Sequence, residues 1–481
     1  MQYRSRFILL AFLSTACNLV LDIVDLSGED LGAGGANGGA NPTGGGGNVP
    51  GGGGAAGGGG SCAACDDRVE WAAGWGSAFD DSGLRVAILP GGAMAVVGEM
   101  AGPIDFDDTR TGSIFVLGFD AAGKLAFSVS FDNCTAPSVA VGAQFRVIVA
   151  GSYSDAPSFN PGLSGPGAFV LSLNPMTGAV EEQTAFGGDV QATAVATDAD
   201  GNVAVVGGFS GDVEFADWGQ RTSSGSGSDT FVAKLTSSLD GAAGMWPRIA
   251  GAGGTLLNFA SAVTFSGTDD IVVVGRKAGT NVDFGGGTLA AGTGMFLARL
   301  SSSTGAAVFV PNARADSVDG LSPGRVVVGG YAPADASFVI KTVNKGNGFV
   351  VSFDFADLVE PTQGVQWVDE LVGVTDDPVV VAGGVEGDVV GAATFLTSLE
   401  LGGRTVSGIG GKDIMLARLD GETGAAEWAE AFGSANDDSP RGIEVSSAIA
   451  LTGAYRGPFD FGAFPLEHEG VADIFVARLT P

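Results

Sequence analysis

Short apolar runs ending in glycine alternate along the chain with a second pattern that begins with an aromatic residue. The apolar runs are rich in valine and occur seven times: Ala95–Gly98, Ile148–Gly151, Val205–Gly207, Val272–Gly275, Val326–Gly329, Val380–Gly383 and Ala450–Gly453. A short apolar run bounded by glycine is typical of a strand that is buried on both faces. The first pattern therefore predicts seven buried strands.

The second pattern alternates phenylalanine, alanine and leucine with other residues, and it also occurs seven times: Phe115–Leu117, Phe169–Leu173, Phe231–Leu235, Phe296–Leu300, Phe349–Phe353, Met415–Leu419 and Phe475–Leu479. Such alternation predicts a strand with one apolar side. Four copies carry a cation on the other side, which we expect to pair with nearby carboxylates such as Glu427: Lys234, Arg299, Arg418 and Arg478.

Each repeat unit is predicted to contain four strands. An inner strand such as 192–197 precedes the valine strand, and a hairpin turn at 198–202 joins the two. The aromatic strand and an outer strand with Trp or Phe follow. Fixed-order repeats of this length indicate a solenoid, a propeller or an array, and no stretch shows helical periodicity.

The two ends of the repeat region resemble each other. Residues 71–81 and 428–438 are identical at seven of eleven positions, while the last unit stops after its third strand. We therefore expect residues 70–75 to supply the missing fourth strand, because such closure removes exposed sheet edges. The sequence predicts an all-β fold, a seven-bladed β-propeller over residues 67–481 with an N-terminal strand closing the last blade. The weakest unit is the fifth, around 308–318.

The N-terminus has the features of an export signal. Arg4 and Arg6 precede an apolar run at 7–13 that is too short to span a bilayer. Residues 14–17 then resemble the bacterial lipobox, although Ser14 stands where that family has a large aliphatic residue. The resemblance implies a lipoprotein-type signal peptide over residues 1–16 and lipid attachment at Cys17. An ordinary signal peptide, giving a secreted protein, is the alternative.

Residues 17–66 are predicted to form a Gly-rich flexible tether, since nothing in their glycine-rich composition can pack. Cys62 and Cys65 lie where the tether meets the repeats. In an exported protein this pair indicates a local disulfide, or a bridge to Cys134, rather than a redox site. A zinc site would need four ligands, and the chain has a single histidine.

The charge of the chain excludes some partners. It has 54 acidic and 23 basic residues and a formal net charge of −31, so it repels phosphate backbones and we expect no nucleic-acid partner. A single histidine leaves little room for a Ser-His-Asp or Cys-His mechanism. We therefore predict no catalytic residues and no bound cofactor apart from the calcium considered next.

Acidic residues recur where an outer strand leads into the next inner strand. Asp80, Asp81, Asp437 and Asp438 are candidate calcium ligands, since Ca²⁺ favours oxygen ligands. The favoured alternative is that they cap turns. Residues 420–428 resemble the tryptophan-docking repeat of quinoprotein dehydrogenases, which implies fastening of one blade to the next and not quinone binding.

The whole of 67–481 resembles the bacterial surface-lipoprotein β-propeller repeat family, and 198–209 is its best copy. The resemblance implies a non-catalytic exported propeller. We expect a monomeric binding or scaffolding module at the outer membrane or cell surface, with a protein or glycan ligand and membrane contact through the lipid anchor only. The long insertions 208–228 and 384–412 are the predicted recognition surface. The alternatives are a propeller enzyme (a quinoprotein-like oxidoreductase or calcium-dependent hydrolase) and a periplasmic envelope-assembly scaffold.

Overall fold

The computed structural model describes residues 68–241, 247–250, 258–266, 270–280, 282–301, 305–322, 324–355 and 364–481. The chain divides into two units, Met1–Ala56 and Gly57–Pro481, and every described residue belongs to the second. The predicted signal peptide and tether therefore lie outside the described residues, together with Cys17, Cys62 and Cys65.

Three separate sheets each contain four antiparallel strands in chain order. They are formed by β2 (Ser82–Ile88), β3 (Met94–Glu99), β6 (Ile114–Phe119) and β7 (Leu125–Phe131); by β12 (Val190–Thr197), β13 (Val203–Phe209), β16 (Asp229–Leu235) and β17 (Pro247–Ala250); and by β18 (Phe259–Ser266), β19 (Asp270–Lys277), β20 (Gly294–Leu300) and β21 (Gly305–Pro311). This repeated order confirms the predicted four-strand unit of inner, valine, aromatic and outer strands.

A six-stranded sheet has the same four-strand order with a hairpin added at its outer edge. Its strands are β8 (Cys134–Val141), β9 (Val147–Tyr153), β10 (Gly167–Leu173), β11 (Val180–Gly187), β14 (Asp212–Glu214) and β15 (Gln220–Thr222). The short 3-10 helices η1 (Ala143–Phe145) and η2 (Ala216–Trp218) are the only helices in the described ranges. The fold is therefore all-β, as predicted.

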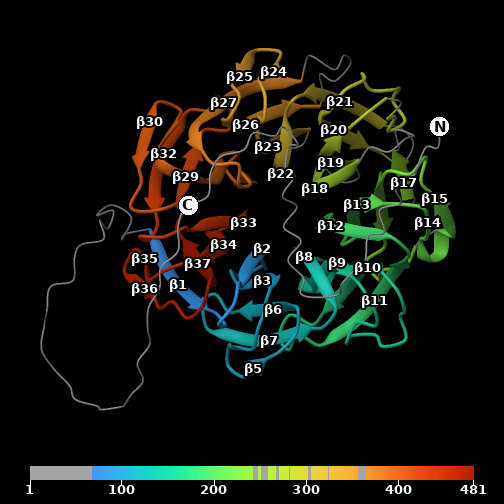
Figure 1. Ribbon diagram of the computed structural model, residues 1–481, viewed down its shortest axis with the longest axis horizontal. Helices are drawn as coiled ribbons and strands as arrows, with labels where there is room; N and C mark the ends of the chain where they lie inside the picture. The colour runs from blue at the N-terminus through green and yellow to red at the C-terminus, as the bar shows by residue number, and fades with distance from the viewer. Residues whose placement is uncertain are drawn as a thin grey trace, which may run out of the picture. The chain divides into compact units, whose positions relative to one another are not determined.

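The first strand of the described chain completes the last sheet. β1 (Val69–Trp75) lies antiparallel to β37 (Asp473–Leu479), with Trp75 opposite Ile474. The inner members of this sheet are β34 (Ile449–Tyr455) and β33 (Ser439–Val445). Figure 1 shows blue β1 beside red β37. The predicted pairing of residues 70–75 with the last strand is confirmed.

The remaining strands form one nine-stranded sheet. Its members are β22 (Arg314–Ser322), β23 (Arg325–Tyr331), β26 (Gly348–Asp354), β27 (Val365–Val374), β28 (Val380–Gly383), β29 (Val389–Leu401), β30 (Arg404–Ser407), β31 (Asp413–Leu419) and β32 (Ala426–Phe432). Two four-strand units meet in it, because the outer strand β27 of one pairs with β29 of the next at Val372 and Glu400.

One strand of this sheet was assigned wrongly from the sequence. The run 380–383 was expected to be a second strand, but β28 is the innermost strand of its unit and β29 takes the second place. The two strands are equally apolar, and the turn between them is short, with Gly384 N–H donating to Asp388 O at 2.8 Å. The predicted insertion 384–412 therefore begins with a turn and a buried strand.

Several insertions between second and third strands form small hairpins: β4 (Ile104–Asp105) with β5 (Thr109–Arg110), β24 (Ala336–Phe338) with β25 (Lys341–Val343), and β35 (Phe459–Phe461) with β36 (Phe464–Leu466). Six insertions place a phenylalanine 4.6–5.6 Å, between ring centroids, from the first aromatic residue of the following third strand. The pairs are Phe106–Phe115, Phe159–Phe169, Phe215–Phe231, Phe284–Phe296, Phe338–Phe349 and Phe461–Phe475. These insertions therefore contribute to the core as well as to the surface.

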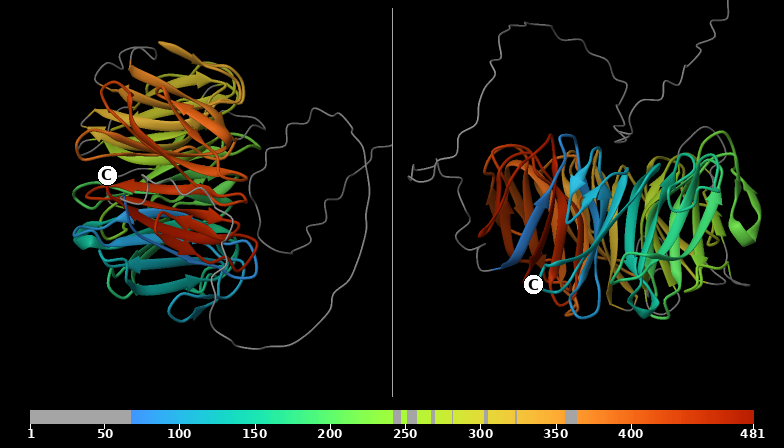
Figure 2. Two further views of the ribbon diagram at one scale, coloured as in Figure 1. Left: turned by 90° about the vertical axis from the view of Figure 1, so that its left-hand side faces the viewer. Right: turned by 90° about the horizontal axis from the view of Figure 1, so that it is seen from below.

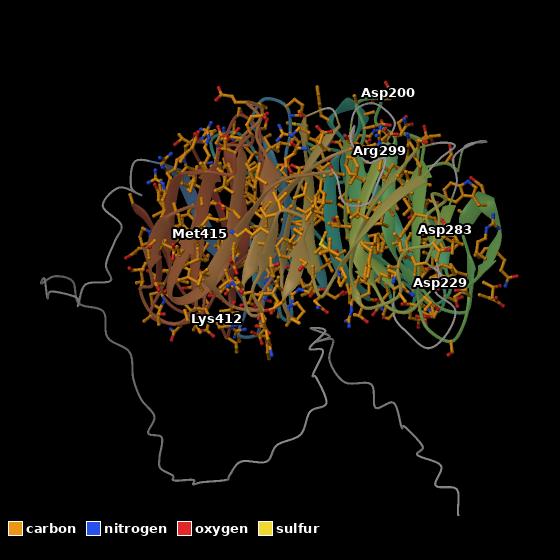
Figure 3. The ribbon with its side chains drawn as sticks, turned by 90° about the horizontal axis from the view of Figure 1, so that it is seen from above. Asp200, Asp229, Asp283, Arg299, Lys412 and Met415 are labelled. Carbon is orange, nitrogen blue, oxygen red and sulfur yellow. The ribbon has the colours of Figure 1, made fainter. Side chains whose placement is uncertain are left out.

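The sheets stand side by side around a common centre, with their first strands innermost (Figures 1 and 2). Two faces result. Asp200, in the turn between a first and a second strand, lies on one face, while Asp229 and Lys412, where third strands begin, lie toward the other (Figure 3). The connections that lead into the first strands therefore share a face with the insertions.

Candidate functional site: the central cavity

Six of the seven innermost strands contain a β-bulge, and in β12, β18 and β22 the bulged residue is hydrogen-bonded to the next sheet. The register shifts at Thr193, Ser261 and Asp316. The hydroxyls of Thr193 and Ser261 each donate to a main-chain carbonyl of the next first strand at 2.7 Å. Asp316 Oδ2 accepts from Val379 N at 3.2 Å. Polar side chains thus form hydrogen bonds between neighbouring sheets at the inner wall of the ring, where the main chains of the two sheets do not form a ladder.

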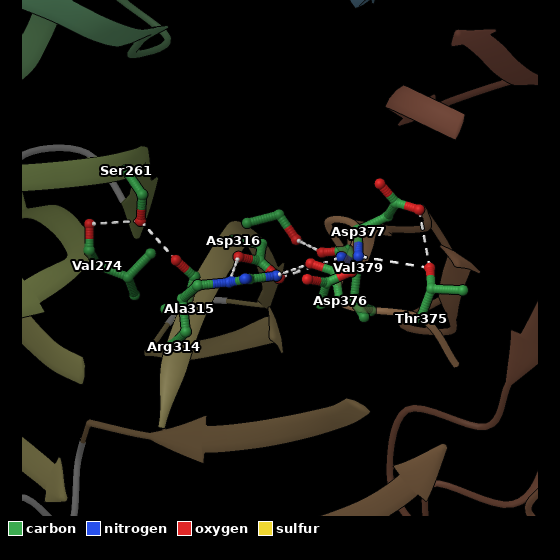
Figure 4. A network of polar contacts seen from close by, with 10 residues as sticks. Ser261, Val274, Arg314, Ala315, Asp316, Thr375, Asp376, Asp377 and Val379 are labelled. Carbon is green, nitrogen blue, oxygen red and sulfur yellow. Dashed lines mark hydrogen bonds and ion pairs between the residues drawn. The ribbon is translucent and has the colours of Figure 1, made fainter. Parts of the chain in front are cut away.

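Figure 4 shows the most polar of these connections. Arg314 Nε donates to Asp316 Oδ1, and Arg314 Nη2 donates to Asp376 O, both at 2.7 Å. Burial raises the pKa of the Asp316 carboxyl, and the neighbouring Arg314 guanidinium opposes that rise. Arg314 therefore spans from β22 to the segment that leads into β28.

The innermost strands enclose a cavity of about 280 Å³. It is lined by residues from β2, β8, β12, β18, β22, β28 and β33, which confirms that these strands face one centre. Most lining residues are small or apolar, but five carry charge: Arg85, Asp316, Asp319, Arg441 and Glu444. None of these five residues was predicted as a site residue from the sequence, although charge inside an otherwise apolar strand is a recognisable signal.

Two arginines lie together in the cavity wall. Arg85 Nη1 donates to Leu84 O at 2.8 Å and to Arg441 O at 2.9 Å. Burial lowers the pKa of the Arg85 guanidinium, and the positive charge of Arg441 lowers it further, while the negative charge of Asp316 opposes the fall. Among the described residues, neither arginine forms an ion pair with a carboxylate.

Two carboxyls, Asp319 and Glu444, also line the cavity and influence each other electrostatically. Asp319 Oδ1 accepts from Gly320 N at 2.7 Å and from Thr264 Oγ1 at 3.2 Å, and Oδ2 accepts from Gly383 N at 2.9 Å. Burial raises the pKa of Asp319 despite these donors. Burial raises the pKa of Glu444 well above its usual range, and the charge of Asp319 raises it further.

The first pair of predicted calcium ligands lies at the entry to β2. Asp80 is exposed and pairs with Arg456 at 3.0 Å. Asp81 is buried, and its two oxygens accept from Ser77 N at 2.6 Å and from Ala101 N at 2.8 Å. Both carboxylates therefore already have partners within the fold, and Asp81 caps the turn that precedes its strand.

The second pair lies at the equivalent entry to β33. Asp437 Oδ1 accepts from Lys412 N at 3.0 Å. Asp438 is buried and accepts from Ser434 N at 2.5 Å and Arg456 N at 3.3 Å. Burial raises the pKa of Asp438 to about 7, with a smaller rise from the charge of Asp413. In the described part of the chain, no three or more His, Cys, Asp or Glu residues are grouped so that they could hold a metal ion.

The other sequence predictions concern turns and ion pairs. The tip at 198–202 is a turn in which Asp198 Oδ1 accepts two main-chain N–H groups at 2.8 and 3.0 Å. Arg418 pairs with Asp388 at 2.8 Å and, as predicted, with Glu427 at 3.1 Å. Cys134 is a free, buried thiol whose pKa is raised to about 12, chiefly by burial. Its predicted bridging partners, Cys62 and Cys65, lie outside the described residues.

The docking-like segment 420–428 fastens two units together, but through a different tryptophan. Trp367 Nε1, from the outer strand of the preceding unit, donates to Gly421 O at 2.8 Å. A Cβ on Gly424 would lie 2.6 Å from the Trp367 ring, and its φ of 76° also favours glycine. The tryptophan of the segment itself, Trp428, stacks instead beneath Arg68 at 4.3 Å.

A ring of antiparallel four-strand units whose first strands line a central cavity is a β-propeller.

No family model matches the chain, and no curated protein matches it. Among solved structures, BamB from Moraxella catarrhalis is 14% identical over 82% of this chain and 93% of its own, with a TM-score of 0.37. The Dos1 propeller is 8% identical over 84% of this chain and 95% of its own, with a TM-score of 0.37. A quinohemoprotein alcohol dehydrogenase from Comamonas testosteroni is 10% identical over 87% of this chain and 77% of its own, with a TM-score of 0.38.

Similarities at this level assign neither a family nor an activity, and the fold is established by the strand order and the ring. In the described residues, no helix has both the length and the apolar character that crossing a bilayer requires.

Proposed function

We propose that this chain is a non-catalytic, lipid-anchored propeller that binds a partner or acts as a scaffold at the cell surface. The observation that carries the proposal is the central cavity, where charged side chains from three different strands converge between apolar walls. Asp319 is held there by three hydrogen-bond donors, and Arg85 by two main-chain carbonyls. Fixed charged groups that converge in a concave site are typical of a binding site.

The N-terminal sequence supports the location. The basic head, the short apolar run and the small residues before Cys17 favour lipidation of that cysteine, and the tether at 17–66 would hold the propeller clear of the membrane. The family resemblance of 67–481 points the same way. We also propose that the nine-stranded sheet is two blades joined through β27 and β29, which makes seven blades in all.

The location is tested by fractionating and protease-treating intact cells that produce the full chain. We expect the protein in the membrane fraction, with the propeller removed by external protease. The Cys17→Ser variant should move to the soluble fraction, and the matched variant Cys62→Ser should not. A protein that resists external protease until the outer membrane is opened would contradict the surface location and favour a periplasmic scaffold.

Binding is tested by crosslinking the same cells through the propeller and identifying what is attached. We expect one envelope protein or glycan in excess over a sample competed with purified, unlabelled propeller. Turnover of a substrate by the purified protein would contradict the non-catalytic assignment.

A further inference from the structure

Four of the five charged side chains in the central cavity are sorted by sign, and the fifth, Asp316, is paired with Arg314 and also attracts Arg85. Arg85 and Arg441 lie together, while Asp319 and Glu444 lie together, and the two groups do not neutralise each other through ion pairs among the described residues. β33 carries Arg441 and Glu444 three residues apart, which separates their Cα atoms by roughly 10 Å along an extended strand. The cavity therefore has a positive level and a negative level along one axis.

Like charges that are buried together repel, and each pair is stabilised by a group of opposite sign. The positive level has N–H donors that could bind a ligand. Arg85 Nη1 donates to two carbonyls, but no hydrogen bond is described from Arg85 Nε or Nη2 or from the Arg441 guanidinium. At the negative level, Asp319 is fixed by its three donors, whereas no described hydrogen bond holds the Glu444 carboxyl.

The wall beside the two levels is apolar. Val139, Val195 and Val263 line the cavity from three neighbouring strands, and each keeps a small exposed fraction of 6–8%. Such a wall suits a methylene chain. A simple anion or a single metal ion would satisfy one level only and would leave the other uncompensated.

We propose that the cavity binds an elongated zwitterion, with its carboxylate between Arg85 and Arg441, its ammonium between Asp319 and Glu444, and its methylene chain along the valines. Lysine supplies both groups, because a four-carbon stem separates its ε-ammonium from the carbon that bears the carboxylate. Free lysine also carries an α-ammonium beside that carboxylate, whereas in a peptide that ends in lysine this nitrogen is an uncharged amide, so the chain end fits the positive level better. Free lysine and a peptide that ends in lysine are two sources of the same group. The inference rests on the proposed binding function and names the ligand class for the same cavity.

The test is calorimetric titration of the purified propeller with L-lysine, with norleucine, which lacks only the ε-ammonium, and with pentylamine, which lacks both the carboxylate and the α-ammonium. We expect L-lysine to bind at least tenfold more tightly than either analogue. A short peptide ending in lysine and the same peptide with an amidated end then separate the two sources: binding of the free-ended peptide alone assigns a chain end, and binding of neither peptide assigns the free amino acid.

Variants locate the two levels. We expect Arg441→Gln and Glu444→Gln each to weaken lysine binding at least tenfold, because each removes one charge with little change in size. Arg221→Gln, on the outer hairpin, and Glu386→Gln, an exposed residue in the turn between β28 and β29, should leave binding unchanged. If Arg441→Gln does not fold, Glu444→Gln and the ligand series still decide.

Equal binding of lysine and norleucine, no binding of any zwitterion, or full binding by a folded Glu444→Gln would overturn the proposal. Calcium binding that Glu444→Gln abolishes, without lysine binding, would likewise replace the zwitterion with a cation. In each of these cases, capture of an envelope partner by the same protein would leave the proposed function standing.

Discussion

Three junctions between neighbouring sheets contain a buried acid at the start of a third strand, and they handle its charge in two ways. At the junction of β16 with β18, Asp229 lies beside the amide Asn258, whose Oδ1 accepts from Ala278 N at 2.9 Å and whose Nδ2 donates to Ser228 O at 3.2 Å. At the two junctions that flank the closing sheet, the residue in the position of Asn258 is an aspartate, namely Asp438 or Asp81.

We call these two the closing junctions. At each of them, a second aspartate is the first residue of the third strand of the preceding sheet. Asp413 and Asp473 are fully buried, and the Oδ1 atom of each is buried with no hydrogen-bond partner among the described residues. Both oxygens of Asp229, by contrast, accept from Ser224, at 2.6 and 3.0 Å. Two acids therefore share a buried site where the ring closes, whereas an acid and an amide share it at the junction of β16 with β18. Like charges so placed favour a bound proton over two full charges.

The largest expected consequence is a stability that falls as pH rises. The folded-state pKa of Asp438 is about 7, above the ordinary aspartate value, so the folded state binds a proton that the unfolded chain has released. The stabilisation is fully present below about pH 4 and is lost as pH rises through about 7. We expect the free energy of unfolding to fall by on the order of 2–4 kcal/mol over this range. Urea denaturation from pH 4 to pH 8 measures it, and stability that rises with pH would contradict the paired acids.

A glycine-to-alanine substitution compares a closing junction, where an added Cβ would meet the buried carboxyl, with a junction where it would meet nothing. A Cβ on Gly433 would lie 1.8 Å from Asp413 Oδ1, whereas a Cβ on Gly187, at the equivalent place in β11, meets nothing within 4 Å. We expect Gly433→Ala to cost about 1–3 kcal/mol through forced movement of the carboxyl. Gly187→Ala should stay within about 0.5 kcal/mol of wild type. Equal effects in thermal melts would show that Asp413 moves freely and that the junction is not tightly packed.

Some features of the fold were predictable from the sequence, and the contacts at these junctions were not. The ring, the four-strand unit and the closing β1 were predictable, because valine and phenylalanine runs repeat in fixed order and the ends of the chain share one pattern. β28 was misplaced because a first strand and a second strand can be equally apolar. The partners of Asp81 and Asp438 were not predictable either, since Asp473 and Asp413 lie far away in the sequence or within an aromatic strand pattern.

The cavity charges escaped prediction for a related reason. Asp316 and Asp319 lie in the unit whose pattern is weakest, and β-bulges at Asp316 and Arg441 break the alternation that would have placed them on a face. A bulge is set by the fit between neighbouring strands, which a single repeat does not encode.

A smaller effect tests the charge itself. Asp413 Oδ2 accepts from Ile409 N at 2.7 Å and Gly410 N at 3.2 Å, so an asparagine can keep these bonds and place its amide N–H groups where Oδ1 has no partner. We expect Asp413→Asn to gain roughly 1–2 kcal/mol at pH 8 and to flatten the pH dependence. The matched variant Asp229→Asn should instead lose about 1 kcal/mol, since the Ser224 hydroxyl loses its acceptor. Losses of similar size in both variants would remove the contrast between the junctions.

The smallest effect we expect is from calcium. A bound calcium ion, like a bound proton, would neutralise the charge of paired carboxylates. Each closing junction offers two buried carboxyls, most of whose oxygens already accept main-chain N–H groups, while Ca²⁺ takes six to eight oxygens. We expect calcium in place of a chelator to shift the melting temperature by less than about 1 °C, because a ligand stabilises only as far as it binds the folded state. A rise of many degrees that Asp413→Asn abolishes would assign calcium to the junction. The fall in stability between pH 4 and 8 would then disappear when calcium is present, because a bound cation would hold both carboxylates ionised.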